Sequence, residues 1–285
     1  MAKNENFVIA DAGGTSTTWL LCSAADGPDS YVYGSGINAT VQCAQSVADC
    51  VAQATALLRE ADRVYFYGAG CKGDSNMAKV SDAIKAINPS AEIEIHSDLL
   101  GAARALFGKS PGIACILGTG SNSCVINSGD IVMNTPPLGY LIGDEGSGAS
   151  LGRRLLREVL RDNLTDSEII ADIEHIAGGK IENIVSEVYS SEAPNKYLSQ
   201  FAPVLSKHIQ NTDVQNIVTS ELKLFFNSCI RPYKDSGFKQ IGFIGSVAEA
   251  FQDIIKNLCK EEDLAFTKVI KNPMEGLINY HQNYK

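Results

Sequence analysis

The chain has 285 residues, of which 45% are hydrophobic, so it is long enough to form two domains with a core in each. Its net charge of −9 at pH 7 and the lack of any basic run argue against nucleic acid or an anionic membrane as a partner. No apolar stretch approaches the roughly 18 residues that a membrane span needs, and residues 1–6 lead into a strand without the apolar core of a signal peptide. The sequence predicts a cytoplasmic protein that acts on a small molecule.

The first part of the chain predicts an α/β sheet that begins with a hairpin. An apolar run at 7–10 is typical of a buried strand, and 18–22 predicts its hairpin partner after a Gly-Gly turn. Helices and strands then alternate, which indicates parallel strand pairs. The predicted helices are 44–58, 77–87 and 99–107, and the predicted strands are 64–67 and 93–95.

A second copy of this arrangement is predicted after Pro111, where Ser110, Pro111 and Gly112 mark a break. Three short strands are expected at 113–117, 124–126 and 131–133. A mainly helical region over 151–227 follows, and then a strand at 240–244. The eight cysteines are scattered, without Cys-x-x-Cys or zinc spacing to histidine, so they are expected to be small buried side chains.

Three short loops rich in Gly, Ser and Thr follow predicted strands, at 11–17, 117–122 and 244–248. Glycine allows backbone N–H groups to approach phosphate oxygens closely, and hydroxyls add donors. One such loop alone is more often an ordinary turn, but three together favour a site for ATP. The predicted phosphate and nucleotide ligands are Gly13, Gly14, Thr15, Ser16, Thr17, Gly118, Thr119, Gly120, Gly245 and Ser246.

Two aspartates follow predicted strands, where an α/β enzyme places its catalytic groups. Asp11 could hold a hydrated Mg²⁺ against ATP phosphates or could form an Asx turn, and we favour the metal. Asp98 fits a general base and an N-cap of the following helix equally well. Asp144, in the glycine-rich loop 143–148, could accept hydrogen bonds from sugar hydroxyls, or that loop could simply be solvated.

A rival interpretation comes from Gly68, Gly70 and Gly73, which match the Gly-x-Gly-x-x-Gly pattern of dinucleotide-binding folds. An acidic residue, Glu92 or Glu94, lies about 20 residues further on, as that pattern requires. The pattern is short and common, however, and it leaves the other three glycine loops unexplained. An oxidoreductase that binds a dinucleotide is therefore the minor alternative.

Taken together, Asp11-x-Gly-Gly-Thr-x-Thr, Asp98, Gly118-Thr-Gly-Ser-Asn, Gly143-Asp-Glu-Gly-Ser and Gly245-Ser-Val-Ala resemble one family. It is the N-acetylglucosamine kinase branch of the BadF/BadG/BcrA/BcrD ATPases, within the superfamily of sugar kinases, actin and heat-shock ATPases. The resemblance implies two ribonuclease-H-like domains with an interdomain cleft. The first would span 1–111, joined by the last helix at about 274–285, and the second 112–273.

The resemblance also implies the activity and the roles of individual residues. It implies ATP- and Mg²⁺-dependent phosphorylation of an aminosugar, most simply N-acetylglucosamine to its 6-phosphate, with Asp98 as the base. The substrate-binding residues implied are Asn38, Gly68, Asn122, Gly139, Tyr140 and Asp144.

The main alternative is an ATPase of the same fold that serves as activator, sensor or assembly protein without sugar transfer. The retention of Asp98 and Asp144 argues against that reading, and the activators' Cys-Gly-Gly cluster ligands are missing from this sequence. The oligomeric state is left open, with a homodimer as one option.

Overall fold

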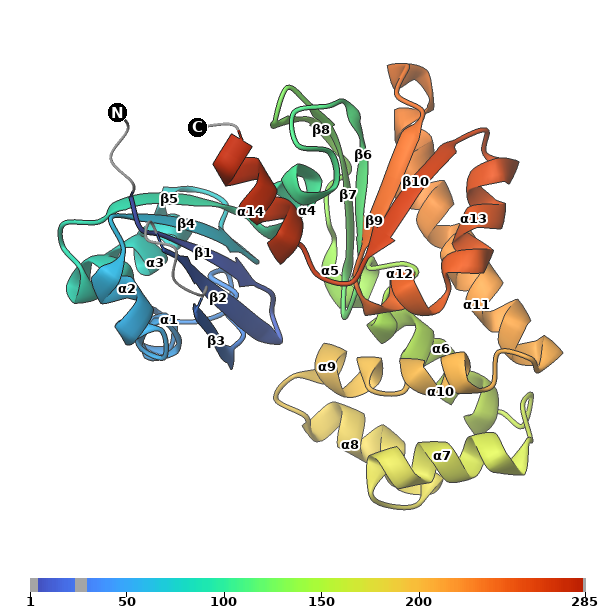
Figure 1. Ribbon diagram of the computed structural model, residues 1–285. Helices are drawn as coiled ribbons and strands as arrows, with labels where there is room; N and C mark the ends of the chain where they lie inside the picture. The colour runs from blue at the N-terminus through green and yellow to red at the C-terminus, as the bar shows by residue number, and fades with distance from the viewer. Residues whose placement is uncertain (1–4, 24–29, 284–285) are drawn as a thin grey trace. The chain divides into compact units, whose positions relative to one another are not determined.

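The computed structural model describes residues 5–23 and 30–283. The chain divides into two compact units, one formed by Met1–Gly108 with Pro273–Lys285 and the other by Lys109–Asn272. Each has its own five-stranded mixed sheet, so the predicted α/β class is confirmed (Figure 1). The prediction that residues 1–6 are not a signal peptide falls partly outside the described residues. The same holds for the end of the last helix, which was predicted to run to 285. Within the described residues, every helix is too short or too polar to cross a membrane.

The sheet of the first unit has the strand order β3-β2-β1-β4-β5. Strands β1, β2 and β3 are antiparallel neighbours, whereas β4 and β5 run parallel to β1. The strands are β1 (Phe7–Ala12), β2 (Ser16–Cys22), β3 (Ser30–Ser35), β4 (Arg63–Gly68) and β5 (Glu92–Ser97). The parallel strands β1, β4 and β5 therefore end at the same edge of the sheet, where the candidate site of this unit is built.

Alternation along β1 divides the first unit's core into two layers. Val8 and Ala10 face a cluster that includes helix residues Val47 and Val80, while Phe7 points to the opposite face and contacts Tyr65. The helices on the Val8 face are α1 (Ala44–Ala52), α2 (Thr55–Glu60) and α3 (Asp74–Ile87), and those on the Phe7 face are α4 (Asp98–Phe107) and α14 (Met274–Asn283).

The single helix predicted over 44–58 is wrong, because α1 ends at Ala52 and α2 begins at Thr55. Two side chains stabilise the break. The Thr55 hydroxyl donates to the carbonyl of Ala52 at 2.6 Å, in competition with the helical backbone. Gln53 turns toward β3, where its Oε1 accepts the N–H of Ser35 at 2.9 Å.

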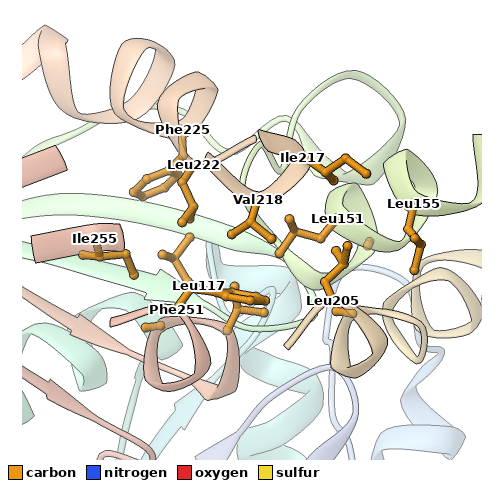
Figure 2. Close-up of a cluster of buried hydrophobic side chains, with 14 of the residues drawn as sticks. Leu117, Leu151, Leu155, Leu205, Ile217, Val218, Leu222, Phe225, Phe251 and Ile255 are labelled. Carbon is orange, nitrogen blue, oxygen red and sulfur yellow. The ribbon is translucent and has the colours of Figure 1, made fainter. Parts of the chain in front are cut away.

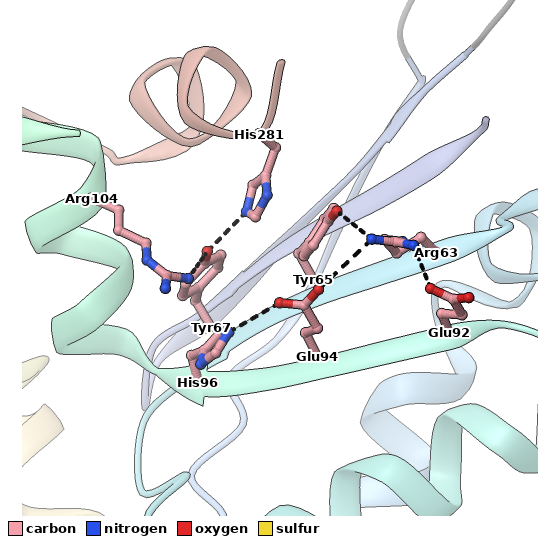
Figure 3. A network of polar contacts seen from close by, with 8 residues as sticks. All are labelled: Arg63, Tyr65, Tyr67, Glu92, Glu94, His96, Arg104 and His281. Atoms are coloured by element: carbon pink, nitrogen blue, oxygen red, sulfur yellow. Dashed lines mark hydrogen bonds and ion pairs between the residues drawn. The ribbon is translucent and has the colours of Figure 1, made fainter. Parts of the chain in front are cut away.

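Helix α14 brings the end of the chain back to the first unit, where His281 joins a polar network (Figure 3). The His281 ring stacks on Tyr65 with centroids 3.6 Å apart, and its Nε2 lies 2.8 Å from the hydroxyl of Tyr67. Arg104 of α4 donates to the same hydroxyl at 3.0 Å. One buried tyrosine hydroxyl thus links α4, β4 and α14.

The sheet of the second unit has the order β10-β9-β6-β7-β8, with the same pattern of antiparallel and parallel pairs as the first. Its strands are β6 (Gly112–Leu117), β7 (Ser121–Asn127), β8 (Asp130–Asn134), β9 (Gln240–Ile244) and β10 (Ala265–Ile270). Strands β3 and β10 were not predicted. Both are edge strands with mostly exposed or half-exposed side chains, so neither has the apolar run by which buried strands are recognised.

The core of the second unit is made largely by helices inserted between β8 and β9, as the helical pattern over 151–227 predicted. Leu117 of β6 packs with Leu151 of α6, Val218 of α11 and Phe251 beside α12 (Figure 2). The helices between β8 and β9 are α5 (Gly139–Ile142), α6 (Gly148–Leu160), α7 (Ser167–Ala177), α8 (Ile184–Ser190), α9 (Pro194–Ser199), α10 (Ala202–Lys207) and α11 (Thr212–Phe225). Two more helices, α12 (Ser246–Ala250) and α13 (Gln252–Glu261), follow β9.

The cysteines behave largely as expected. All eight are free thiols, and six of them are buried; Cys43 is exposed and Cys229 half-buried. No group of three or more His, Cys, Asp or Glu residues that could hold a metal ion is found among the described residues. The chain therefore has neither a disulfide framework nor a zinc-type cluster in its described part.

Candidate functional site

Two carboxyl groups interact at the edge where β1 and β5 end. Asp11 lies at the end of β1, and Asp98 follows β5 as the first residue of α4. Burial, and to a smaller degree the nearby charge of Asp98, raise the pKa of Asp11 to about 7. Burial also raises the pKa of Asp98, opposed by the N–H of Leu99, which donates to its Oδ1 at 2.8 Å. Two acids held this way resist carrying negative charge together unless a cation joins them.

The N-cap interpretation of Asp98 is wrong, because Ser97 holds that position. The Oγ of Ser97 accepts the N–H of Leu100 at 3.2 Å, as an N-cap side chain does. Asp98 therefore lies within the first turn of α4, where the helix dipole favours its ionised form. Its second carboxylate oxygen is not needed to cap the helix.

The first glycine loop is a tight hairpin turn between β1 and β2. The N–H of Gly13 donates to the carbonyl of Ser16 at 3.0 Å, and Ile37 donates to the carbonyl of Gly13 at 3.0 Å. A Cβ added to Gly14 would meet nothing within 4 Å, so this residue faces open space. The buried Thr17 hydroxyl instead donates to the carbonyl of Ser35 at 2.8 Å, which ties the loop to β3. The structure thus gives Thr17 a scaffolding contact.

Asn38 and the Gly68–Gly70 segment lie together beside the end of β1. Asn38 pairs with Ala69 as an isolated parallel bridge, and Ala69 donates to the carbonyl of Ala12 at 2.8 Å. Gly70 has φ of +72°, and a Cβ there would lie 2.4 Å from Oδ1 of Asn38. These two predicted substrate-side segments are therefore brought next to the Asp11 strand by backbone pairing.

The same geometry accounts for Gly70 of the Gly-x-Gly-x-x-Gly pattern without a dinucleotide. The pattern does lie between a strand, β4, and a helix, α3, as the fingerprint requires. However, the pattern follows the fourth strand of a sheet that opens with an antiparallel hairpin, whereas the dinucleotide fold carries it in its first βα turn. Gly70 is needed because its backbone packs against Asn38 and Thr40.

In the second unit, the loop 117–122 lies against the N-terminus of α6. Gly148 donates to the carbonyl of Gly118 at 2.7 Å, and Ala149 donates to that of Thr119 at 3.1 Å. Ser147, at the N-cap, accepts the N–H of Ser150 at 3.2 Å. The first N–H groups of α6 are thus used to hold this loop and the N-cap, so the attraction that α6 offers an anion here is that of its helix dipole.

Asp144 lies in the separate loop between α5 and α6, with φ of +54°. Its carboxylate accepts the backbone N–H of Ser121, which lowers its pKa, but burial raises that pKa more. A Cβ on Gly120 would lie 3.0 Å from Oδ2 of Asp144, so only glycine fits there without displacing the carboxylate. The buried hydroxyl of Ser121 has no hydrogen-bond partner among the described residues. Ser121, which belongs to the Gly-Thr-Gly-Ser-Asn motif but is not among the predicted ligands, thus has a hydroxyl beside Asp144 that is free among the described residues.

The third glycine loop packs directly on the second. Gly245 has φ of +121°, and a Cβ there would lie 2.3 Å from the carbonyl oxygen of Leu117. Its N–H donates to Ile270 at the end of β10, at 3.1 Å, and Ser246 begins α12. Two loops far apart in the sequence are therefore neighbours in the second unit.

The remaining predicted substrate residues of this unit are fixed by structural contacts. Gly139 and Tyr140 begin α5, and Arg153 donates to the carbonyl of Tyr140 at 2.7 Å. Oδ1 of Asn122 accepts the N–H of Ser123 at 2.9 Å and lies 3.3 Å from Nδ2 of Asn134. The predicted residues thus form two groups, one gathered around Asp11 in the first unit and one around the loop 117–122 in the second.

Comparison with known proteins identifies the family. A solved structure of a proposed N-acetylglucosamine kinase from Porphyromonas gingivalis is 34% identical to this chain, with 98% of this chain and 99% of that one covered and a TM-score of 0.87. Another, from Chromobacterium violaceum, shares the fold with a TM-score of 0.74 at 16% identity over 97% and 98% of the two chains. The chain belongs to the N-acetylglucosamine kinase-like family of sugar kinases, which have the actin-like ATPase fold.

A curated relative matches over a shorter stretch. Glucosamine kinase GspK from Vibrio cholerae is 27% identical over 175 residues, which are 58% of this chain. The match spans 57% of the length of that relative. No family model matches the chain.

Proposed function

We propose that the protein transfers the γ-phosphoryl group of ATP to the 6-hydroxyl of an aminosugar, with N-acetylglucosamine as the first candidate and glucosamine as the second. The observation that carries the proposal is the pair of interacting carboxyl groups, Asp11 and Asp98, where β1 and β5 end. The relatives support it, since they are described as kinases of these two sugars.

Asp98 is the proposed general base. Burial raises its pKa, and a carboxylate with a raised pKa is a stronger proton acceptor. In the proposed reaction Asp98 takes the proton of the sugar hydroxyl, the hydroxyl oxygen bonds to the γ-phosphorus, and the bond to ADP breaks. Leu99 N–H holds one carboxylate oxygen at 2.8 Å, so the side chain is positioned before the sugar binds.

The residues present fit a magnesium ion. Asp11 and Asp98 offer carboxylate oxygens, and Mg²⁺ is usually held by one or two carboxylates together with waters and substrate phosphates. Their mutual repulsion, seen in the raised pKa of Asp11, is what a divalent cation would relieve. Asp11 is the proposed ligand, through water, and a bound ion would neutralise charge on the phosphates.

The glycine loops are the proposed contacts of ATP. In the first unit, Gly13 to Thr15 would approach phosphate oxygens, with Gly14 facing open space. In the second unit, Gly118 to Gly120 lie at the N-terminus of α6, which favours an anion, and Gly245 with Ser246 lies beside them. Asp144 and the segments of Asn38, Gly68 and Tyr140 are the proposed sugar contacts.

Replacement of the base tests the proposal. We expect Asp98→Asn to lower kcat by a factor of about 100 or more, because a general base contributes at least that much, while the Kd for ATP changes less than about threefold. Asp82→Asn, on the exposed face of α3, is the matched control and should retain wild-type turnover. Wild-type turnover in the Asp98 variant would contradict the assigned role.

A further inference from the structure

A pocket lies in the second unit, bordered by the residues on either side of Asp144. Its volume is about 350 Å³, within the range of small-molecule sites. Residues of α5, α6, α11 and the loop before α6 form its walls. None of them belongs to the glycine loops 117–122 or 244–248.

One wall of the pocket is unusually rich in arginine. Arg153, Arg154 and Arg157 of α6 all line it, and Arg153 and Arg157 are one helical turn apart. Arg154 is well paired, since its Nε lies 2.7 Å from Oε1 of Glu158. Arg157 shares that same oxygen at the longer distance of 3.6 Å.

Arg153 has no carboxylate within ion-pair distance among the described residues. Its Nη1 donates instead to the carbonyl oxygen of Tyr140 at 2.7 Å. Arg153 and Arg157 thus present two guanidinium groups, of which only that of Arg157 has a carboxylate, Glu158, within ion-pair distance among the described residues. Such groups bind phosphate oxygens in a bidentate manner.

The rest of the pocket is lined mainly by carboxylates and apolar side chains. Glu145 contributes a carboxylate that has no ion pair with any described cation, whereas Glu221 is already occupied by the hydroxyl of Ser150. Leu141 and Ile142, which are 75% and 74% exposed, form an apolar rim. The pocket therefore offers separate places for an anion, for an N–H or ammonium donor, and for an apolar face.

We propose that this pocket binds a phosphorylated aminosugar, with its phosphate on Arg153 and Arg157, its nitrogen on Glu145 and its ring against Leu141 and Ile142. The choice of an aminosugar rests on the proposed function, whereas the phosphate half rests on the arginines alone. Since Arg153 also holds the carbonyl of Tyr140, the pocket adjoins the loop proposed to contact the sugar substrate.

The test is a calorimetric titration of the full chain in phosphate-free buffer. Glucosamine 6-phosphate, glucose 6-phosphate and inorganic phosphate are the probes, and a non-hydrolysable ATP analogue with N-acetylglucosamine is present to fill the transfer site. We expect Arg157→Gln to weaken glucosamine 6-phosphate binding at least tenfold. Arg161→Gln, which removes the same charge at the exposed C-cap of α6 outside the pocket, should stay within twofold of wild type.

Two further arms make the result decisive. Arg153→Gln should weaken binding as Arg157→Gln does, and Glu145→Gln should reduce the preference for glucosamine 6-phosphate over glucose 6-phosphate. Equal affinities in Arg157→Gln and Arg161→Gln would overturn the pocket even if the protein proves to be an aminosugar kinase. Arginine-dependent binding of phosphate in a protein that phosphorylates no sugar would instead overturn the proposed function and the aminosugar part of this inference.

Discussion

Asp11 illustrates how a buried carboxyl group can cost stability. Its pKa is raised from 3.8 to about 7 by burial and by Asp98, so the folded protein disfavours the ionised form. The folded state therefore binds more protons than the unfolded state between about pH 4 and 7. By linkage, the contribution of this group to the free energy of unfolding falls as the pH rises through that window and is lowest above pH 7.

Asp11→Asn should remove this penalty. We expect the variant to be more stable than wild type by about 1–2 kcal/mol at pH 8, with the difference shrinking toward pH 4.5, while turnover falls. Urea unfolding at the two pH values measures the effect. If wild type and variant lose stability in parallel as the pH rises, the acid pair is not the source of the penalty.

The N-terminus of α4 shows where sequence reasoning at single residues stops. Ser97 and Asp98 are both good N-cap residues, and only the structure shows that Ser97 takes the position. Ser121 was not predicted as a ligand for a similar reason. Its hydroxyl matters because it is buried and unpaired among the described residues, and burial of one serine cannot be read from a motif.

At the scale of elements, the strands with continuous apolar runs were predictable, because burial on both faces leaves a clear signal. Edge strands β3 and β10 were not, since polar residues flank or interrupt their short apolar stretches, whereas the equally exposed edge strand β8 keeps the apolar run 131–133 and was predicted. The break between α1 and α2 depends on Gln53 reaching β3, a contact 18 residues away. The site roles of the predicted residues stay predictions, although backbone pairing brings Asn38 beside the Gly68 segment.

The packing of the third loop on the second gives a prediction for the nucleotide. Gly245→Ala would place a Cβ against the carbonyl of Leu117 in a strained backbone conformation, so we expect a loss of about 1–3 kcal/mol in stability. ATP affinity should fall at least fivefold. Gly179→Ala is the control, because its Cβ would only touch Glu187 at 3.8 Å. Unchanged ATP titration in a folded Gly245→Ala protein would contradict the role of this loop.

Helix α14 gives a prediction for acid stability (Figure 3). Burial, and then the charges of Arg104, His96 and Arg63, lower the pKa of His281 from 6.5 to about 3. Because the unfolded chain protonates near pH 6.5 and the folded one does not, this stability is complete above pH 6.5 and is lost as the pH falls toward 3. The loss for this group is of the order of 2–3 kcal/mol.

His281→Gln tests this linkage, because glutamine does not titrate. We expect its free energy of unfolding to depend less steeply on pH between 4 and 6.5 than that of wild type, whatever its absolute stability. His175→Gln, at an exposed position of α7, should keep the wild-type slope. Identical slopes in all three proteins would show that His281 is not the group responsible.

At the scale of the whole molecule, the chain forms the same sheet topology twice. Each unit also has a glycine loop and a carboxyl group whose pKa is raised by burial, the loop 11–17 with Asp11 in the first and the loop 117–122 with Asp144 in the second. The first unit supplies Asp11 and Asp98, and the second supplies the loops at Gly118 and Gly245 beside α6. Phosphoryl transfer needs an acceptor, a base and a bound phosphate donor. The proposed function therefore requires residues from both units, and no single unit should be active alone.

The most direct test of this account is product analysis of the full chain with Mg-ATP and a panel of N-acetylglucosamine, glucosamine, N-acetylmannosamine and glucose. We expect equal amounts of ADP and a sugar 6-phosphate with N-acetylglucosamine or glucosamine, detected by phosphorus NMR and mass spectrometry, and none with Asp98→Asn. Release of inorganic phosphate without any sugar phosphate, at a rate that the sugars do not change, would contradict the account and indicate an ATPase.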